Sequence, residues 1–350
     1  MPCPIALNMF KTFFSKTLTT AWQSKGVIST LLWPLSLITR VWLSQKLYPS
    51  RLTKARSLRV PLVVVGNVLA GGVGKTPVLM ALVEHLKAQG LQVGVIAKPY
   101  RAQYENSKDV SLVIGPSSKA TDVGDEPLLI WSKCQVPVVV SGQRAQAAQT
   151  LMDLFASTQV ILSDDGLQHP GLHPDLVVCV FDQRGLGNER LLPSGPLREP
   201  WPPKNLEVPM WVINTTLNPK MRGHVATKTL SKKVINERGE IRNLSDFIEI
   251  QQNCCAVAGT AQPQGFFSML ADVGLGKLQT RSLPDHASID HYRSSLPHGK
   301  MILCTEKDAV KLWPHFENVW AVPLNIELEP DFLSAFDQTL SACLTSHAVS

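Results

Sequence analysis

The sequence of 350 residues has no acidic residue before Glu84, and it lacks the cysteine spacing of disulfide-rich or zinc-binding folds. Its seven cysteines are an odd number and none forms a C-x-x-C pair, so a reducing compartment fits best. Internal repeats and low-complexity tracts are also missing. With 44% hydrophobic residues, the chain is too apolar to be disordered and long enough for two packed domains.

The missing acids leave one end of the chain strongly basic. Residues 1–60 carry nine lysines and arginines, and the whole chain has a net charge of +6. Such an end predicts contact with an anionic surface, either nucleic acid or a membrane. Few aromatic residues are interleaved with the basic ones beyond Trp33, Trp42 and Tyr48, which argues against nucleic acid as the partner.

The apolar residues of this end favour the membrane. Residues 26–39 are uncharged, but this run is interrupted by Pro34 and falls short of the ~20 residues needed to span a bilayer. Leu35, Ile38 and Trp42 recur at helical spacing after a proline suited to a helix start. No small-residue cleavage site follows, which argues against a signal peptide. We predict a helix that lies on the membrane surface; the alternative is a helix that covers the protein's own core.

From Val60 onward, buried-strand patterns alternate with amphipathic helix patterns. Strands are expected at VPLVVVGN, QVGVIAKPY, VSLVIG, VPVVVS, QVILSDDG, DLVVCVFD and VPMWVIN, and the first helix at PVLMALVEHLKAQG. This alternation predicts an α/β fold with a mostly parallel sheet and helices on both faces. A Gly- and Pro-rich stretch at 183–203 is too long for an ordinary connection, and residues 217–252 fit no element.

LAGGVGKTP, residues 69–77, follows the first strand and precedes the first helix, which is the context of a phosphate-binding loop in a P-loop NTPase-like fold. Its glycines let backbone N–H groups face phosphates, Lys75 reaches their oxygens and Thr76 can bind Mg²⁺. Leu69 replaces the usual first glycine, which changes only the entry to the loop. The alternative is a glycine-rich turn without a ligand. The expected ATP-binding residues are Gly71, Gly72, Val73, Gly74, Lys75, Thr76 and Pro77.

Three further motifs carry candidate catalytic groups. SDDGLQH places Asp164 and Asp165 at a strand end, either as Mg²⁺-directed carboxylates or as turn caps. VGDEP places Asp125 and Glu126 before a helix, as general base and metal partner or as helix N-caps. LPDHASIDHY contains His286, which either polarises a catalytic carboxylate or is a surface histidine.

Together these motifs resemble the tetraacyldisaccharide 4′-kinases of lipid A biosynthesis. The resemblance covers residues 26–325 and is carried by VVVGNVLAGGVGKTP, VGDEP, LSDDGLQH, GNERLLPSGPLREP, LPDH and TEKDAVKL. A phosphate loop without its first glycine is usual in that family. The resemblance implies ATP- and Mg²⁺-dependent phosphorylation of the 4′-hydroxyl of an acylated, 1-phosphorylated glucosamine disaccharide, at the cytoplasmic face of the inner membrane.

The resemblance also implies a role for individual residues. Asp125, paired with His286, accepts the proton of the sugar hydroxyl, and Arg198 faces the phosphates from the second domain, so that catalysis needs domain closure. The catalytic residues implied are Asp125, His286, Lys75 and Arg198. The metal-site residues implied are Thr76, Glu126, Asp164, Asp165 and Glu199.

We therefore expect four units: an N-terminal extension with the membrane-surface helix at 1–59, a nucleotide-binding domain at 60–175, a smaller α/β domain at 176–325 and a C-terminal helix at 326–350 that packs on the first domain. AKPYR, ending at Arg101, departs from the family's Ser-Arg-Gly-Tyr-Gly run, and Ala287 replaces a frequent second histidine. The rival is a dimerising partitioning-type ATPase on the membrane, but the extra lysine of that class is absent, since Ala70 takes its place.

Overall fold

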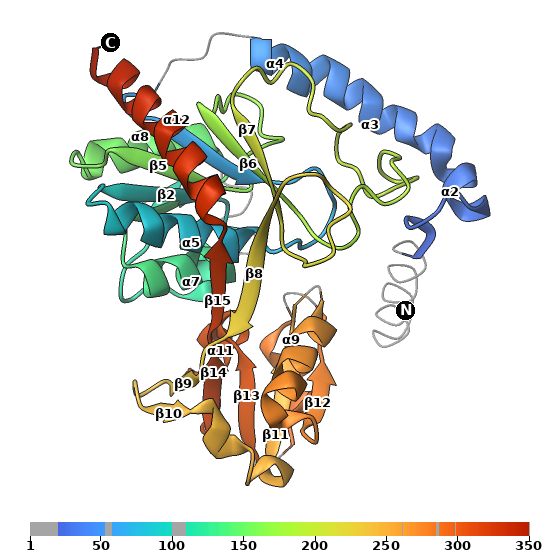
Figure 1. Ribbon diagram of the computed structural model, residues 1–350, viewed down its shortest axis with the longest axis vertical. Helices are drawn as coiled ribbons and strands as arrows, with labels where there is room; N and C mark the ends of the chain where they lie inside the picture. Colours follow the sequence, from blue (N-terminus) through green and yellow to red (C-terminus); the bar gives the residue numbers. More distant parts are fainter. Residues whose placement is uncertain are drawn as a thin grey trace.

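The computed structural model describes residues 20–52, 58–99, 110–260, 262–284, 287–297 and 299–349. Two sheets lie one above the other in Figure 1, each with its own helices, and a long N-terminal helix lies to one side of the upper sheet. We call the upper sheet with its helices the large lobe and the lower sheet with its helices the small lobe.

The large lobe is built on a nine-stranded sheet in the order β15-β8-β7-β6-β1-β5-β2-β4-β3. Neighbouring strands are parallel, except that β3 pairs antiparallel with β4 and β15 with β8. The strands are β1 (Leu62–Gly66), β2 (Val93–Ala97), β3 (Ser111–Val113), β4 (Val138–Ser141), β5 (Val160–Asp164), β6 (Leu176–Phe181), β7 (Met210–Asn214), β8 (His224–Leu230) and β15 (Leu324–Leu328). The predicted α/β fold with a mostly parallel sheet is confirmed.

Helices of the large lobe cover both faces of its sheet. They are α5 (Lys75–Ala88), α6 (Ala120–Val123), α7 (Asp125–Cys134) and α8 (Arg144–Leu154). The crossovers from β1 to β2 and from β2 to β4 run one way across the sheet, and the crossover from β4 to β5 runs back. Because parallel crossovers are right-handed, α5 and α7 cover one face and α8 the other. The central strands β1, β2, β5 and β6 are accordingly buried along their whole length.

The small lobe has a six-stranded sheet in the order β10-β9-β14-β13-β11-β12. Its strands are β9 (Lys233–Asn236), β10 (Ile241–Asn243), β11 (Cys254–Ala258), β12 (Gln279–Ser282), β13 (Met301–Thr305) and β14 (Val319–Val322). Its helices and helical turns are η3 (Leu244–Phe247), η4 (Gln251–Asn253), α9 (Pro263–Leu270), η5 (Ala271–Leu275), α10 (Ile289–Ser295) and α11 (Glu306–Leu312). Alternate residues of β11 point into two separate hydrophobic clusters, one on each face.

The chain divides between the lobes at a different place from the one predicted. A division after residue 175 would separate β1 from β6, although the two strands are hydrogen-bonded neighbours with Val63 opposite Leu176. The chain instead leaves the large sheet after β8 and returns to it through β15. These two strands form the antiparallel ribbon that joins the lobes in Figure 1. Alternating strand and helix patterns do not reveal which parallel strands are neighbours, and the boundary depends on that pairing.

The C-terminal helix α12 (Pro330–Val349) packs on the large lobe. Phe332, Phe336 and Leu340 are buried in the core of the large sheet. The ring of Trp211 on β7 lies 6.2 Å from that of Phe332 and 5.8 Å from that of Phe336, in edge-to-face contacts. The C-terminal helix therefore contributes to the same hydrophobic core as the first strands of the large sheet.

The N-terminal helix begins earlier than predicted. It consists of α2 (Val27–Leu32), η1 (Trp33–Leu35), α3 (Ser36–Trp42), η2 (Leu43–Leu47) and α4 (Tyr48–Leu52). Together they form 26 helical residues, so the predicted start at Pro34 is wrong, and the helix is long and apolar enough to cross a membrane by length and composition alone. Pro34 lies in a short 3₁₀ turn within it.

The two sides of this helix differ. On one side, Ser29 Oγ donates to the carbonyl of Ser194 over 2.7 Å and Thr39 Oγ1 to that of Leu192 over 2.8 Å. The other side exposes a row of large apolar side chains, namely Val27, Ile28, Leu31, Trp33, Leu35, Leu37, Ile38, Val41 and Trp42. One face therefore binds the loop between β6 and β7, residues 182–209, and the apolar face is left uncovered by the described part of the chain.

Candidate active site

The phosphate loop lies between β1 and α5, as its sequence context predicts. Gly71 and Gly74 have φ angles of 88° and 91°, in the left-handed region that favours glycine. Leu69, at the position of the missing glycine, is fully buried and forms a bridge with Leu197 of the 182–209 loop. A side chain is required there for packing, which explains why the loop has no glycine at its entry.

Two side chains hold the phosphate loop from behind. The Arg184 guanidinium donates to the carbonyls of Ala70 and Gly72 over 3.2 and 3.0 Å. Thr215 Oγ1 donates to the carbonyl of Val73 over 3.0 Å. These contacts occupy carbonyl oxygens of the loop, so they fix its backbone and leave its N–H groups to bind an anion.

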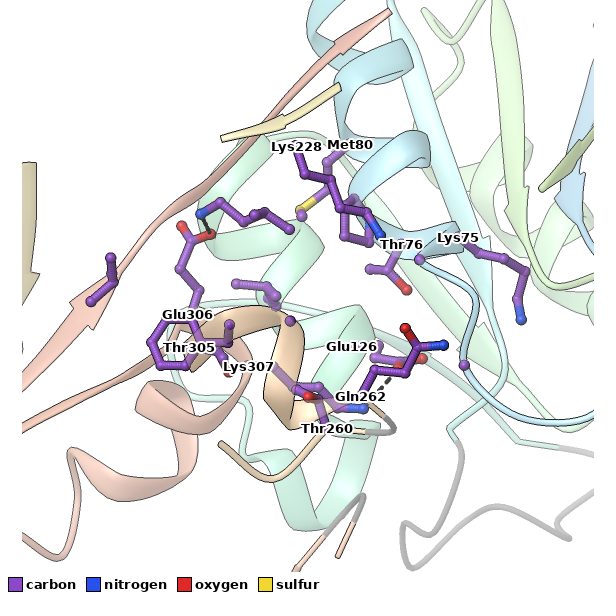
Figure 2. A pocket seen from close by; sticks show the side chains of 18 of the residues that line it. Lys75, Thr76, Met80, Glu126, Lys228, Thr260, Gln262, Thr305, Glu306 and Lys307 are labelled. Carbon is purple, nitrogen blue, oxygen red and sulfur yellow. Dashed lines mark hydrogen bonds and ion pairs between the residues drawn. The ribbon is translucent and has the colours of Figure 1, made fainter. Parts of the chain in front are cut away.

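A cavity of about 270 Å³ lies between the two lobes, and we call it the interlobe cavity (Figure 2). Its lining is Gly72, Val73, Gly74, Lys75, Thr76, Pro77, Met80, Glu126, Leu129, Lys228, Leu230, Thr260, Gln262, Gly265, Phe266, Met269, Thr305, Glu306, Lys307, Val322 and Leu324. The predicted ATP-binding residues all belong to this lining except Gly71, which lies beside the guanidinium of Arg184. The cavity therefore combines the phosphate loop of one lobe with side chains of the other.

Asp164 lies next to the phosphate loop because β5 pairs with β1, in a register that sets Val65 opposite Asp164. Thr76 Oγ1 donates to Asp164 Oδ2 over 3.3 Å, while Asp164 Oδ1 is buried without a hydrogen-bond partner among the described residues. Burial raises the pKa of the Asp164 carboxyl to about 7, and the nearby Glu126 carboxylate contributes to the rise. A buried carboxylate with an unused oxygen beside a hydroxyl is an environment that a cation would stabilise.

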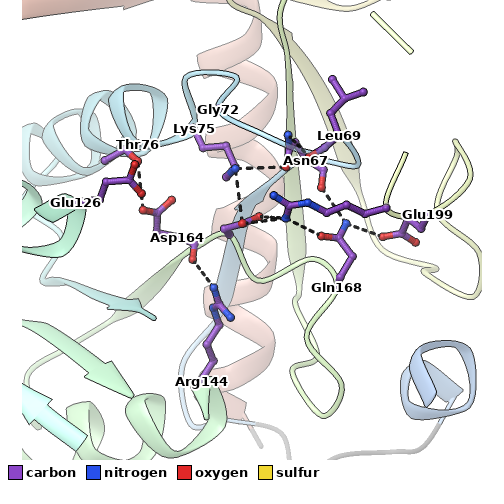
Figure 3. Close-up of polar contacts among 12 residues, drawn as sticks. Asn67, Leu69, Gly72, Lys75, Thr76, Glu126, Arg144, Asp164, Gln168 and Glu199 are labelled. Carbon is purple, nitrogen blue, oxygen red and sulfur yellow. Dashed lines mark hydrogen bonds and ion pairs between the residues drawn. The ribbon is translucent and has the colours of Figure 1, made fainter. Parts of the chain in front are cut away.

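This environment fits Mg²⁺ rather than a metal held by protein ligands alone. Among the described residues, no three His, Cys, Asp or Glu side chains gather into a metal cluster. Mg²⁺ in phosphotransferases is usually bound by one or two carboxylates together with phosphate oxygens. Thr76, Asp164 and Glu126 would supply that small ligand set, and Figure 3 shows them on the same side of Lys75.

Asp165 faces the phosphate loop lysine. Its Oδ2 lies 3.7 Å from Lys75 Nζ and 3.0 Å from an Arg198 nitrogen, and its backbone is left-handed with φ of 56°. Burial alone would raise its pKa, but the charges of Lys75, Arg198 and Arg144 together hold the pKa of Asp165 well below its usual range. Asp165 therefore stays ionised and orients two cations next to the place where phosphates would bind.

Arg198 belongs to the large lobe and not, as predicted, to the second domain. It lies on the 182–209 loop, and its backbone N–H donates to the carbonyl of Val68 over 2.7 Å, at the entry to the phosphate loop. Domain closure is therefore not needed to bring Arg198 to the site. The prediction was wrong because the 182–209 loop connects β6 and β7, which are both strands of the large sheet. Only the pairing of the strands shows that these two strands belong to that sheet.

Glu199 does not lie with the predicted metal residues. Its fully buried carboxylate accepts hydrogen bonds from Arg51 on α4 over 2.8 and 3.0 Å and from Gln168 Nε2 over 2.9 Å. Figure 3 shows Glu199 on the far side of Lys75 from Thr76 and Asp164. The structure thus contradicts its assignment as a metal ligand, because both of its oxygens already bind nitrogen donors.

Asp125 and Glu126 begin α7. The N-cap of this helix is Gly124, and no side chain makes a cap hydrogen bond. The alternative prediction, that Asp125 or Glu126 is a helix N-cap, is therefore wrong. Lys311 Nζ contacts Asp125 Oδ2 over 2.5 Å and Lys307 Nζ contacts Glu126 Oε1 over 2.8 Å. Both lysines come from α11 of the small lobe, so the two carboxylates lie where the lobes meet.

His286, the predicted partner of Asp125, lies outside the described residues, as does Arg101 of the AKPYR segment. The pairing of Asp125 with His286 therefore stays a prediction. Of the predicted site residues, Thr76, Glu126 and Asp164 lie on one side of Lys75 in Figure 3. Asp165 contacts both Lys75 and Arg198.

The sequence profile of the tetraacyldisaccharide-1-P 4′-kinase family matches residues 28–341 of this chain. The chain belongs to this family. It is 41% identical over 330 residues to the tetraacyldisaccharide 4′-kinase of a Polaromonas species, with 93% of this chain and 96% of that protein covered. It is 37% identical over 328 residues to the enzyme of the same description from Pasteurella multocida, with 91% and 98% covered.

A solved structure agrees with this membership. The crystal structure of LpxK from Aquifex aeolicus in complex with ATP has a TM-score of 0.72 and 25% sequence identity to this chain, and covers 91% of this chain and 100% of its own. The resemblance predicted from the motifs is confirmed, and with it the prediction of a kinase. The partitioning-type ATPase is not favoured.

Three residues of this 4′-kinase site were missed by sequence reasoning. Lys228 on β8 lines the interlobe cavity, with its Nζ 3.4 Å from where a Cβ on Gly74 would stand, and burial lowers its pKa. Arg144 is buried, and its guanidinium donates to the backbone carbonyl of Asp164 over 3.0 Å. Gln262 of the small lobe donates to Asp182 of the large lobe over 2.7 Å. Each contact joins segments far apart in the sequence, so no local motif indicated it.

Proposed function

We propose that this chain transfers the γ-phosphoryl group of ATP to the 4′-hydroxyl of a tetraacylated glucosamine disaccharide 1-phosphate, giving the bisphosphorylated lipid A precursor lipid IVA. One observation carries the proposal. The phosphate loop, the Thr76–Asp164 contact and Glu126 meet at the interlobe cavity, and Asp125 lies next to Glu126 at the start of the same helix. This is the set of groups that phosphoryl transfer to an alcohol requires.

The interlobe cavity suits a nucleoside triphosphate. The phosphate loop offers backbone N–H groups and the N-terminal end of α5 to the phosphates, and Lys75 and Lys228 supply positive charge. The rest of the lining includes Phe266 and Met269 of the small lobe, whose apolar side chains suit a nucleobase. Binding of ATP would therefore engage both lobes at once.

Mg²⁺ completes this proposal. Thr76, Asp164 and Glu126 would hold it, and the clearest open position is Asp164 Oδ1, which has no hydrogen-bond partner in the described part of the chain. When bound, the ion neutralises charge on the phosphate oxygens during transfer. Asp165 would keep Lys75 and Arg198 oriented toward the same phosphates by its ion pairs with both.

Asp125 is the proposed acceptor of the hydroxyl proton, with His286 as its partner. Its side chain is only 12% exposed, and Lys311 Nζ contacts its Oδ2. The contact with Lys311 holds the Asp125 side chain in a fixed orientation at the junction of the lobes. It would take the proton as the hydroxyl oxygen bonds to phosphorus, a role that needs hydrogen-bond reach to the sugar.

The N-terminal helix is proposed to lie on the cytoplasmic surface of the bacterial inner membrane. Leu31 and Ile38 on its outer face are 74% and 70% exposed, and Arg40 and Lys46 are exposed near them. Apolar side chains of this kind bury in the acyl boundary, while the basic residues contact anionic headgroups. The opposite face is bound to the 182–209 loop, which supports a helix in the surface plane over one that crosses the bilayer.

The test is direct phosphorylation of the lipid. The full-length protein in detergent is incubated with γ-labelled ATP, Mg²⁺ and the disaccharide 1-phosphate lipid, and the products are separated. We expect a bisphosphorylated lipid from the wild type, and at least ~100-fold less from Asp125→Asn with nearly unchanged ATP affinity. ATP hydrolysis without lipid product would refute the proposed function and would favour an ATPase switch.

A further inference from the structure

A buried ion pair links the last turn of the N-terminal helix to the loops around the phosphate site. The Arg51 guanidinium on α4 is 6% exposed and the Glu199 side chain is fully buried. Arg51 makes a two-pronged contact with both Glu199 oxygens, at 2.8 and 3.0 Å. It also donates to the carbonyls of Leu167 and Lys204, each over 2.8 Å. One side chain thus joins the helix, the SDDGLQH loop and the 182–209 loop.

From Glu199 the contacts continue to the phosphate loop. Gln168 Nε2 donates to Glu199 Oε1 over 2.9 Å and to the backbone carbonyl of Asn67 over 2.8 Å. Asn67 Oδ1 accepts from Lys75 Nζ over 3.3 Å, and Gln168 Oε1 accepts from Arg198 over 3.3 Å. Both cations proposed to bind the transferred phosphate are therefore oriented by Asn67 and Gln168, as Figure 3 shows for Lys75, Asn67, Gln168 and Glu199.

We propose that Arg51 is a positioning residue for the phosphate site, acting through Glu199 and Gln168 on Lys75 and Arg198. The planar fork of arginine matches both oxygens of Glu199, and a lysine cannot reproduce this match. Without the arginine guanidinium, the Glu199 carboxylate must accept hydrogen bonds from other donors, and Gln168 loses the fixed orientation that Glu199 gives it. The position of the N-terminal helix on the large lobe and the orientation of Lys75 and Arg198 then depend on the same contacts.

The test compares Arg51→Lys, Glu199→Gln and their double variant in the full-length protein. Arg51→Lys keeps the charge opposite Glu199, so it avoids an unpaired buried carboxylate. Thr39→Val is the matched control, because it removes another hydrogen bond between the same helix and the same loop, to the carbonyl of Leu192, with no link to Gln168. The measurements are the dissociation constant of ATP without lipid, kcat at saturating ATP and lipid, and thermal stability.

We expect Arg51→Lys and Glu199→Gln each to lower kcat by roughly 10- to 100-fold, and to weaken ATP binding, at temperatures where each variant is fully folded. The double variant should lose no more than the larger single loss, because the two residues act as a unit. Thr39→Val should stay within about twofold of wild type in both measurements.

Two outcomes would overturn the inference. Arg51→Lys with wild-type kcat and ATP affinity would show that the ion pair only stabilises the fold. A loss in Thr39→Val as large as that in Arg51→Lys would show that general attachment of the helix, and not this set of contacts, is what matters. The kcat measurement rests on the proposed function, but ATP binding does not use the lipid. A wild type that fails to phosphorylate the lipid therefore refutes that function and leaves this inference testable.

Discussion

Asp308 on α11 is a fully buried carboxylate that organises the small lobe beneath the interlobe cavity. It accepts hydrogen bonds from the Gly259 N–H over 3.0 Å, the Tyr292 hydroxyl over 2.5 Å and Thr305 Oγ1 over 2.7 Å. Burial and the Asp308 carboxylate raise the pKa of Tyr292 above its usual range, so the hydroxyl remains a donor. Thr260, the residue after Gly259, lines the cavity. We predict that Asp308→Ala destabilises the small lobe and weakens ATP binding.

The magnitude follows from these contacts. Hydrogen bonds to a charged acceptor contribute about 1.5 kcal/mol or more each, so losing three of them costs at least about 4.5 kcal/mol. The Tyr292 hydroxyl and the Gly259 N–H would be left buried and unpaired. Tyr292→Phe removes only one of the three bonds and should cost about 1.5 kcal/mol.

Hydrogen exchange measures this loss within one lobe, which matters because two lobes need not unfold together. A loss of about 4.5 kcal/mol corresponds to exchange of the β11 amides that is more than about a thousandfold faster, at 1.4 kcal/mol for each factor of ten. The amides of β1 in the large lobe are the internal control and should keep their wild-type rates. If the β11 amides of Asp308→Ala exchange less than tenfold faster, or if β1 and β11 accelerate equally, the reasoning is refuted.

Three other changes test the site and the helix. Lys228→Met should raise the dissociation constant of ATP by roughly 10- to 100-fold, because a partly buried lysine beside the phosphate loop loses its contact with phosphate; an unchanged affinity would exclude this contact. Asp164→Asn should lower kcat by roughly 100-fold and shift the Mg²⁺ dependence to higher concentration, and an unaltered Mg²⁺ titration would exclude Asp164 as a ligand. Replacing Leu31 and Ile38 together by lysine should abolish flotation with anionic vesicles without changing thermal stability, since both side chains are exposed; a variant that still floats would count against the surface helix.

Much of the fold could be predicted because its strands are strongly patterned. Central parallel strands are buried on both faces, so they appear in the sequence as continuous β-branched runs such as VPLVVVGN and DLVVCVFD. β8 was missed within residues 217–252 because HVATKTL has no continuous apolar run, and most of its positions are only partly buried. Its structure depends on pairing with β15, which lies about a hundred residues later in the chain.

The candidate site also contains residues that could be predicted from the sequence and residues that could not. The phosphate loop is a local structure, so Gly74, Lys75 and Thr76 could be placed from adjacent residues. Glu199 was misassigned because its partner Arg51 is 148 residues away and nothing near it in the sequence indicates a buried ion pair. A carboxylate is chemically suited to either a metal or an arginine, and only the neighbouring side chain distinguishes the two.

The sequence by itself determined the family, the α/β fold class, the phosphate loop and the acid-free, apolar end of the chain. Each of these is encoded in contiguous residues, where spacing and side-chain chemistry are sufficient. The tertiary structure decided which strands are neighbours, and through them the lobe boundary, the large-lobe origin of Arg198 and the partners of Glu199, Asp125 and Glu126. Such contacts depend on long-range packing, because a side chain's partner is set by where the sheets bring distant segments together.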